Sequence, residues 1–164
     1  MLITLLTKQK MVESSDRKIN YFAYDVLLNQ DQMRLVIKQW QECFPAWLPN
    51  YRLVFDSYSI SWRGGIAGLK EDEKATVYGA LYVIDEQQLS IIDKYEGLAN
   101  IRMRIKVLVK SDFGEHYAYT HVSSRPRGHV SPTKQYLALL TKGLKQLGYS
   151  DKIIMNVINE ATKR

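Results

Sequence analysis

Glu96 is the carboxylate of this chain whose surroundings best suit acid/base chemistry. It follows the stretch DEQQLSIIDKY, in which Leu89, Ile92 and Tyr95 recur at a spacing of three, a pattern typical of a short helix with an apolar face. Most glutamates at helix ends are solvated, and composition alone favours that interpretation. Its neighbours, however, are a tyrosine and a glycine rather than charges. A carboxylate at the mouth of an apolar barrel has its pKa raised by desolvation, so Glu96 is a candidate general acid/base.

Other candidates for chemistry are weaker. His116 and His121 lie five residues apart on one predicted strand, which places them on opposite faces, and with His129 they form no metal-binding pattern. The glycine-rich stretch WRGGIAG lacks the strand-to-helix setting and the lysine that bind phosphate. Cys43, the single cysteine, has no histidine near it in the sequence and is interpreted as a buried thiol.

The composition of the 164 residues fits one soluble domain. With 46% hydrophobic residues the chain can build a core, and one cysteine excludes an internal disulfide. A lone free cysteine suits a reducing compartment. No apolar run approaches the roughly 20 residues of a membrane span, and the start of the chain lacks a signal-peptide cleavage pattern. We therefore expect a cytoplasmic protein without membrane association.

The net charge of +6 raises the question of a nucleic-acid partner. The basic residues are dispersed, and in IRMRIK the residues Arg102, Arg104 and Lys106 alternate with apolar ones, which predicts a strand with one charged, solvated face. No nucleic-acid-binding motif accompanies them. The sequence therefore favours a solvated surface and disfavours nucleic acid as the partner.

The order of predicted elements mixes strands and helices. We expect residues 1–18 to form an N-terminal arm and residues 19–164 a single domain. Stretches rich in β-branched and aromatic residues predict strands over 19–28, 51–59, 76–85, 101–109 and 115–122. Apolar residues at helical spacing predict helices over 30–40 after Asn29, 85–96, 132–148 beginning with Pro132, and 151–163 after Ser150.

Glycines and prolines mark the connections between these elements. Pro45 and Pro49 are expected to end the first helix, and the pair Gly64-Gly65 predicts a turn or a close backbone approach. The acidic run that ends at residue 75 predicts a hairpin loop, and residues 125–133 predict a loop. Strands followed by helices indicate an α+β domain, a small mixed, mostly antiparallel curled sheet or barrel with helices packed outside.

Four segments, in order between about residue 20 and residue 149, resemble the γ-glutamylcyclotransferase family with its AIG2-like fold. YFAYDVLL (21–28) is similar to the family's opening strand and loop, and SISWRGGIAGL (59–69) to its Gly-Gly segment. LSIIDKYEGL (89–98) is similar to Leu-x-x-Leu-Asp-x-x-Glu-Gly, and PTKQYLALLTKGLKQLGY (132–149) to Pro-x-x-x-Tyr with a later glycine.

The resemblance implies a transferase of glutathione metabolism that cyclises a γ-glutamyl amide or peptide to 5-oxoproline and releases an amine or amino acid. Glu96 corresponds to the family's acid/base, while Tyr24 and Tyr136 correspond to pocket tyrosines. The loop Asp25, Val26, Leu27 and Leu28 would bind the substrate through backbone N–H groups. The implied partner is a small-molecule γ-glutamyl substrate, and no metal or cofactor is required. The choice between monomer and homodimer stays open.

The chain departs from the family pattern at two places. Asp25, Val26 and Leu27 stand where the family has Gly-Ser-Asn, which removes side-chain donors and adds a carboxylate. A further family tyrosine is missing near Ile101 or Arg102, and Arg102 could instead supply a positive charge for a carboxylate.

Three hypotheses follow. The chain is an active γ-glutamylcyclotransferase, a related enzyme that acts on another amide through Glu96, or a non-catalytic member that binds a small molecule or a protein. Both enzyme hypotheses expect Glu96 to be partly buried in a cavity beside residues 24–28, with unpaired N–H groups facing it. The binding hypothesis expects Glu96 on the open surface, or Val26 and Leu27 filling the cavity.

Overall fold

The computed structural model describes residues 17–97 and 102–163. The N-terminal arm predicted over residues 1–18 therefore lies outside the described residues, apart from Arg17 and Lys18, and so does Ile101. None of the described helices is long and apolar enough to cross a membrane.

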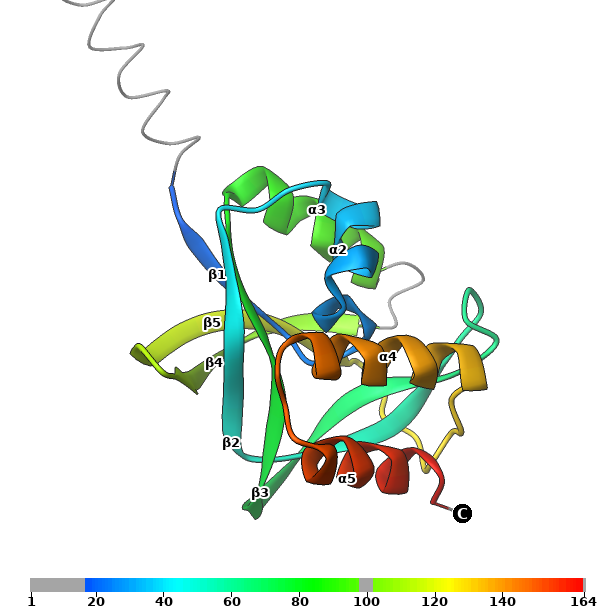
Figure 1. The fold of residues 1–164 in the computed structure, drawn as a ribbon. Coiled ribbons are helices and arrows are strands. Elements are labelled where there is room, and N and C mark those ends of the chain that lie inside the picture. The colour runs from blue at the N-terminus through cyan, green and yellow to red at the C-terminus, as the bar shows by residue number, and fades with distance from the viewer. Residues whose placement is uncertain (1–16, 98–101, 164) are drawn as a thin grey trace, which may run out of the picture.

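Five strands form a closed barrel in the order β1-β3-β2-β4-β5 (Figure 1). They are β1 (Ile19–Ala23), β2 (Glu42–Ser59), β3 (Gly64–Ile84), β4 (Arg102–Ser111) and β5 (Gly114–Ser123). Neighbouring strands are antiparallel except where β1 runs parallel to β5, with Tyr21 paired to Tyr119. The predicted α+β class, with a mixed and mostly antiparallel barrel, is confirmed.

Strands β2 and β3 form one long, bent hairpin that the sequence predicted only in pieces. Their pairing runs from Glu42 opposite Val83 to Ser59 opposite Gly64, with a register shift between Pro49 and Tyr51. The prediction of a break over 44–50 was wrong, because this stretch lies within β2. The acidic run up to residue 75 is not a hairpin loop either, since it lies within β3 as exposed and half-exposed residues.

The first strand is shorter than predicted. It ends at Ala23, and Val26–Leu28 form a short 3₁₀ helix, η1, instead of continuing the strand to residue 28. Asp25 causes this change of direction, because its carboxylate accepts a hydrogen bond from the Leu27 N–H at 2.9 Å. Such a side-chain contact two residues ahead is a common way for aspartate to begin a turn.

Within the described ranges, four α-helices pack on the outside of the barrel (Figure 1). They are α2 (Gln30–Ile37), α3 (Glu86–Gly97), α4 (Lys134–Gln146) and α5 (Asp151–Ala161). Asn29 and Ser150 cap α2 and α5 as predicted, since their side chains accept the first free N–H groups. The predicted start of α4 at Pro132 was wrong, because Thr133 is the cap and the helix begins at Lys134.

Helix α4 packs closely against η1, which brings the end of the first strand beside the C-terminal half of the chain. A Cβ atom added at Gly143 would touch the backbone of Asn29 and the side chain of Leu28. The Asn29 amide also donates to the Leu139 carbonyl at 2.9 Å. The glycine is therefore needed for this close approach.

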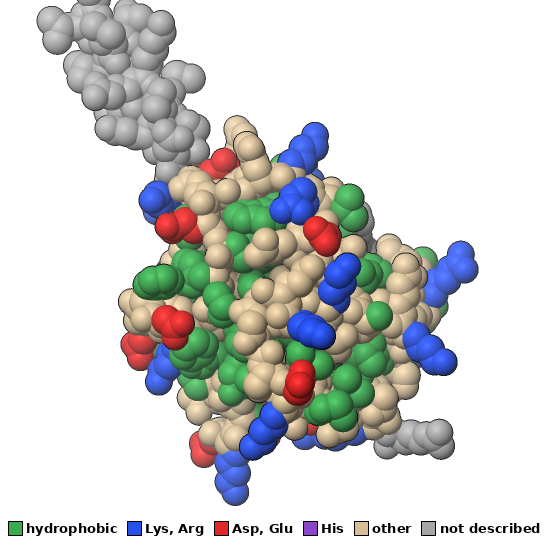
Figure 2. Space-filling view, viewed as in Figure 1, with side chains coloured by type: hydrophobic (Ala, Val, Ile, Leu, Met, Phe, Trp, Pro, Cys, Tyr) green, Lys and Arg blue, Asp and Glu red, His purple; other side chains and the backbone are tan. Residues whose placement is uncertain are grey.

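The basic side chains are dispersed, as the sequence predicted, on the face of the molecule that Figure 2 presents. Lysine and arginine side chains are spread over this face, with acidic and hydrophobic side chains between them (Figure 2).

Candidate active site

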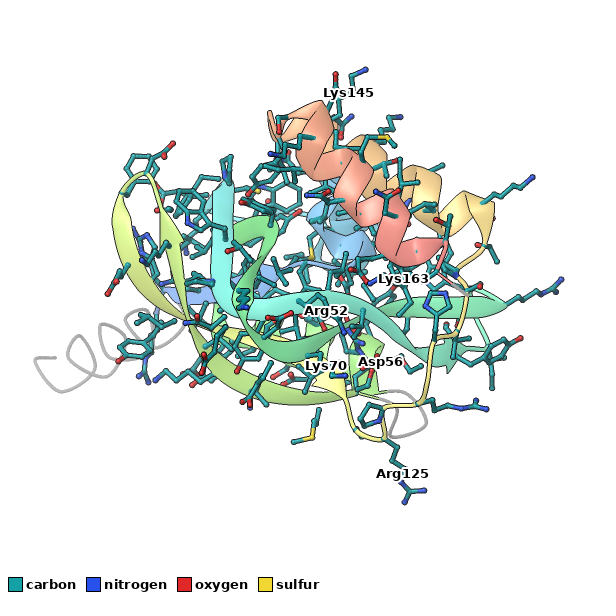
Figure 3. The ribbon with its side chains drawn as sticks, turned by 90° about the horizontal axis from the view of Figure 1, so that it is seen from below. Arg52, Asp56, Lys70, Arg125, Lys145 and Lys163 are labelled. Carbon is teal, nitrogen blue, oxygen red and sulfur yellow. The ribbon has the colours of Figure 1, made fainter. Side chains whose placement is uncertain are left out.

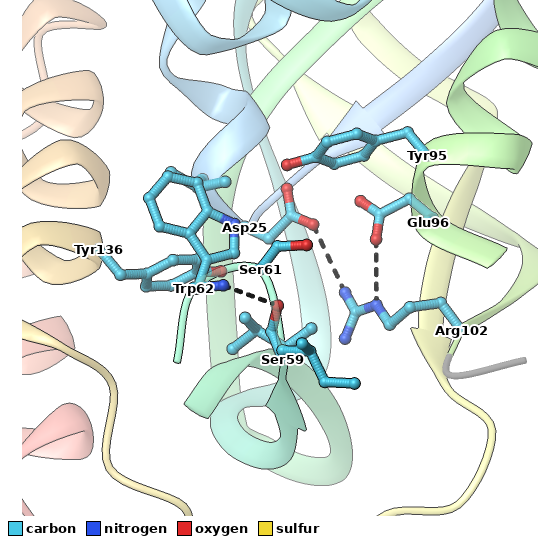
Figure 4. A pocket seen from close by; sticks show the side chains of 11 residues that line it. Asp25, Ser59, Ser61, Trp62, Tyr95, Glu96, Arg102 and Tyr136 are labelled. Atoms are coloured by element: carbon cyan, nitrogen blue, oxygen red, sulfur yellow. Dashed lines mark hydrogen bonds and ion pairs between the residues drawn. The ribbon is translucent and has the colours of Figure 1, made fainter. Parts of the chain in front are cut away.

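A pocket of about 270 Å³ opens beside η1 at one end of the barrel (Figure 4). Four segments that are distant in sequence meet there: the turn after β1, the connection between β2 and β3 with the start of β3, the end of α3 with the start of β4, and the first turn of α4. The lining residues are Asp25, Val26, Ser59, Ile60, Ser61, Trp62, Ile66, Tyr95, Glu96, Arg102 and Tyr136.

Glu96 lies in the last turn of α3 and is only 6% exposed. Its Oε2 accepts a hydrogen bond from Arg102 Nε at 3.3 Å, whereas its buried Oε1 has no hydrogen-bond partner among the described residues. Burial raises the pKa of Glu96 well above its ordinary value, the negative charge of Asp25 raises it further, and Arg102 opposes both. Glu96 is therefore not a solvated helix-end residue.

Arg102 occupies the centre of the site, with its side chain 1% exposed. Its guanidinium donates to the Ala67 carbonyl at 2.6 Å and to the Tyr24 hydroxyl at 3.0 Å. The Asp25 carboxylate lies 3.5 Å from Nη2, so Arg102 bridges two acidic groups (Figure 4). The predicted solvated face of IRMRIK was wrong at this residue, because two buried carboxylates compensate the charge inside the barrel.

Asp25 combines a structural contact with a position on the pocket wall. One oxygen accepts the Leu27 N–H, and the other faces Arg102. The Leu28 and Asn29 N–H groups donate to the carbonyls of Asp25 and Val26 within the same turn. The expectation of unpaired N–H groups within residues 24–28 is therefore wrong for Leu27 and Leu28.

The other predicted loop residues divide between the pocket and the core. Val26 lines the pocket, whereas Leu27 and Leu28 are 1% exposed and belong to the hydrophobic core. The Leu27 carbonyl accepts a hydrogen bond from the Tyr82 hydroxyl at 2.8 Å. Because Leu27 and Leu28 are buried in the core and do not line the pocket, the cavity stays open beside Val26.

The two predicted pocket tyrosines have different positions. Tyr136 lines the pocket, and its hydroxyl accepts the Ala67 N–H at 3.2 Å, while its ring packs edge-on against Trp62. Tyr24 lies behind the pocket, where its hydroxyl donates to the His121 carbonyl at 2.6 Å and accepts from Arg102. Tyr24 therefore positions Arg102 and does not itself line the pocket.

Residues that no sequence motif marked as functional complete the pocket wall. Ser59, Ser61 and Trp62 come from the end of β2 and the turn that follows it, and Tyr95 precedes Glu96 on α3. Burial raises the pKa of Tyr95 to about 12, so this hydroxyl stays protonated near neutral pH. The sequence signal that could have found Ser59, Ser61 and Trp62 is their position just before the Gly64-Gly65 pair.

A chain of hydrogen bonds, buried at Tyr21 and His121 and partly exposed at Asp93, anchors α3 to the barrel. Asp93, one turn before Glu96, lies 2.9 Å from His121 Nε2, and His121 Nδ1 lies 2.8 Å from the Tyr21 hydroxyl. Burial lowers the pKa of His121. The two hydrogen bonds of His121 therefore give it a structural role between α3 and the barrel. Within the described ranges, no group of three His, Cys, Asp or Glu side chains is placed to bind a metal ion.

Comparison with known proteins adds an independent finding. A family model described as gamma-glutamyl cyclotransferase, AIG2-like, matches residues 21–138. The gamma-glutamylcyclotransferase of Mus musculus is 26% identical over 147 residues, which cover 81% of this chain and 76% of the relative. The protein of the same name from Bos taurus is 27% identical over 133 residues, covering 78% and 71%.

Solved structures show a corresponding likeness of fold. A structure named gamma-glutamyl cyclotransferase superposes with a TM-score of 0.81 at 22% identity, covering 90% of this chain and 93% of the other. A yeast gamma-glutamyl cyclotransferase described as specific to glutathione has a TM-score of 0.63 at 12% identity, covering 90% and 98%.

Proposed function

The chain belongs to the gamma-glutamyl cyclotransferase, AIG2-like family, and we propose that it cyclises a γ-glutamyl amide or peptide to 5-oxoproline with release of an amine or amino acid. The observation that carries this proposal is the state of Glu96. Its carboxylate is buried in a pocket, has one oxygen without a hydrogen-bond partner among the described residues, and has a raised pKa. A carboxylate of this kind is a stronger base than a solvated one.

One carboxylate is enough for both proton transfers. Glu96 accepts a proton from the substrate's neutral α-amine as the nitrogen attacks the γ-carbonyl carbon and forms the ring C–N bond. The carbonyl oxygen becomes an oxyanion in the tetrahedral intermediate. Glu96 then donates the same proton to the leaving nitrogen as the original C–N bond breaks, which restores the carboxylate.

The pocket would contribute mainly by holding the substrate folded. Ring closure is intramolecular, so the acceleration depends on keeping the amine near the γ-carbonyl. Trp62 and Tyr136 pack edge-on at 5.2 Å between ring centres and offer a rigid wall for the substrate's carbon chain. The hydroxyls of Ser61 and Tyr95 lie on the same pocket and are available to its polar groups.

A specific observation favours a second candidate, a non-catalytic small-molecule binding module. The N–H groups of residues 27–29 are used inside the turn. A γ-glutamyl substrate therefore loses two of the backbone donors that the resemblance assigned to its binding, those of Leu27 and Leu28. The open cavity beside Glu96 favours the enzyme over this alternative.

The experiment is product analysis with glutathione, γ-glutamyl-alanine and γ-glutamyl-lysine as substrates. We expect 5-oxoproline and the released amine in equal amounts from at least one of them. Free glutamate in place of 5-oxoproline would indicate hydrolysis and a different amide reaction. Saturable binding without any turnover would overturn the proposal in favour of the binding module.

A further inference from the structure

A second hollow, of about 540 Å³, lies on another face of the barrel. It is bounded by β2, β3, the loop over residues 125–133 and the C-terminal end of α5, and we call it the α5 groove. Figure 3 shows Arg52, Asp56 and Lys70 gathered below α5, with Lys163 near the end of that helix. The groove and the pocket at Glu96 share no lining residue within the described part of the chain.

Three of the four lysine and arginine side chains that line the α5 groove have no acidic partner among the described residues, whereas the fourth, Lys163, pairs with Glu160 at 2.8 Å. These three are Arg52, Lys70 and Arg127, and none of them forms an ion pair with any of the residues described. Arg52 Nε is buried and has no hydrogen-bond partner among those residues. A buried donor without an acceptor is costly, and a bound anionic group would remove that cost.

The same groove contains a carboxylate without a cation. Asp56 is 7% exposed, and its Oδ1 accepts a hydrogen bond from Ser123 Oγ at 2.6 Å. It forms no ion pair with a described residue. A side chain at Gly68 would overlap this carboxylate, so the glycine leaves the space that Asp56 occupies. A buried carboxylate that has a hydrogen bond but no ion pair gains further stability from a cation placed beside it.

We propose that the α5 groove binds a zwitterion, an amino acid or short peptide with an apolar side chain. Its carboxylate would lie on Arg52, Lys70 and Arg127, and its ammonium group on Asp56. The three basic residues would repel a simple cation, and a simple anion would leave Asp56 without a positive partner, so a zwitterion satisfies both kinds of group. Val54 and Leu69, both half-buried on the groove wall, provide the surface for the apolar side chain.

Three probes of matched shape test the charge requirement directly. They are L-leucine, 4-methylpentanoate, which lacks its ammonium group, and 3-methylbutylamine, which lacks its carboxylate. Binding is followed on the full chain through NMR shifts of the backbone amides of residues 127–129 on the groove and 59–62 on the other pocket. We expect L-leucine to shift 127–129 saturably and to bind at least about tenfold more tightly than either analogue.

Charge-removing variants identify the groups involved. Asp56→Asn should reduce the affinity for L-leucine to that for 4-methylpentanoate, and Arg52→Gln should weaken both ligands about tenfold. Lys145→Gln, on the exposed surface of α4 and outside the groove, is the matched control and should change neither. The same spectra report whether each variant is folded.

The proposal fails if 4-methylpentanoate binds as tightly as L-leucine, because the groove would then be a plain anion site. It also fails if L-leucine shifts only 59–62, or shifts no amide saturably. The selectivity of the wild-type chain among the three probes decides the question even if a variant does not fold. The result is independent of 5-oxoproline formation, because no catalytic turnover is measured.

Discussion

Glu96, Asp25 and Arg102 form a buried group of two carboxylates and one guanidinium. Two carboxylates near one cation cannot both be fully compensated, so the proton affinity of Glu96 depends on the charge of Asp25. Asp25 therefore acts on the proposed chemistry through Glu96 and also fixes the turn through the Leu27 N–H. These two effects can be separated by substitution.

Asp25→Asn keeps an oxygen that can accept the Leu27 N–H and removes the negative charge. The proposed mechanism requires Glu96 as a carboxylate, so activity should rise as pH increases through the pKa of Glu96. Since the charge of Asp25 raises that pKa, the acidic limb of kcat/KM should move to lower pH in the variant. Profiles of kcat/KM against pH for the wild type and the variant, measured with the same substrate, test this. An unchanged or higher midpoint of the acidic limb in the variant would refute the coupling between Asp25 and Glu96.

Arg102→Met tests how far the protein depends on the buried cation. The variant leaves Asp25 and Glu96 without their shared partner, which should cost about 3–5 kcal/mol in the free energy of unfolding at neutral pH. Loss of Arg102 raises the pKa of Glu96 further, because the guanidinium is the group that lowers it. The deficit should thus grow as pH increases, because protonated Glu96 tolerates burial. Urea unfolding of both proteins at several pH values measures this difference in the free energy of unfolding. A difference that does not change with pH would contradict this explanation.

The sequence pointed to Glu96, which lies in the pocket, but not to Arg102 as its electrostatic partner. A Leu-x-x-Leu-Asp-x-x-Glu-Gly pattern is local and can be recognised in one segment. Arg102 sits in an alternating basic stretch that is typical of a solvated strand face, and only the folded barrel shows that its side chain turns inward. The positions of Leu27 and Leu28 in the core depended in the same way on the turn that Asp25 begins.

At the scale of elements, the loop over residues 125–133 positions α4 and hence Tyr136. Gly65 N–H donates to the Ser131 carbonyl at 2.8 Å, and a Cβ atom at Gly65 would overlap the Val130 carbonyl. The predicted close backbone approach at the Gly-Gly pair is confirmed at this residue. Thr133, at the end of the loop, caps α4.

Gly65→Ala should therefore displace the loop and destabilise the protein by about 1–3 kcal/mol. Gly128→Ala is the matched control on the same loop, because a Cβ atom there meets nothing within 4 Å. Denaturant midpoints of the two variants provide the comparison. Equal stability would mean that the loop does not need the close contact at Gly65.

The elements themselves followed closely from local pattern where the pattern was strong. The helices after Asn29 and Ser150, the helix before Glu96, and the hairpin of β4 and β5 were all predicted, with capping residues or alternation as the signal. The long ribbon of β2 and β3 was not, because Pro45, Pro49 and an acidic run interrupt its composition. Pairing between distant residues, rather than local propensity, keeps these interrupted stretches extended.

At the scale of the whole molecule, the C-terminal helices are tied to the barrel. The Tyr149 hydroxyl, between α4 and α5, lies 2.8 Å from the Ala46 carbonyl and 2.6 Å from the Gly79 carbonyl, on β2 and β3. We expect one cooperative unfolding transition, with tryptophan fluorescence and far-ultraviolet circular dichroism giving the same midpoint. Loss of helical signal before the fluorescence change would show that the helices are an independent unit.

The central claim is that Glu96 performs the proton transfers of 5-oxoproline formation. Glu96→Gln keeps the shape of the side chain and removes the base, so the most direct measurement is kcat of this variant beside the wild type, with circular dichroism to verify folding. We expect kcat to fall by about 10²–10⁴-fold, the usual contribution of a positioned acid/base. A folded Glu96→Gln variant that turns over as fast as the wild type would contradict the proposed role of Glu96.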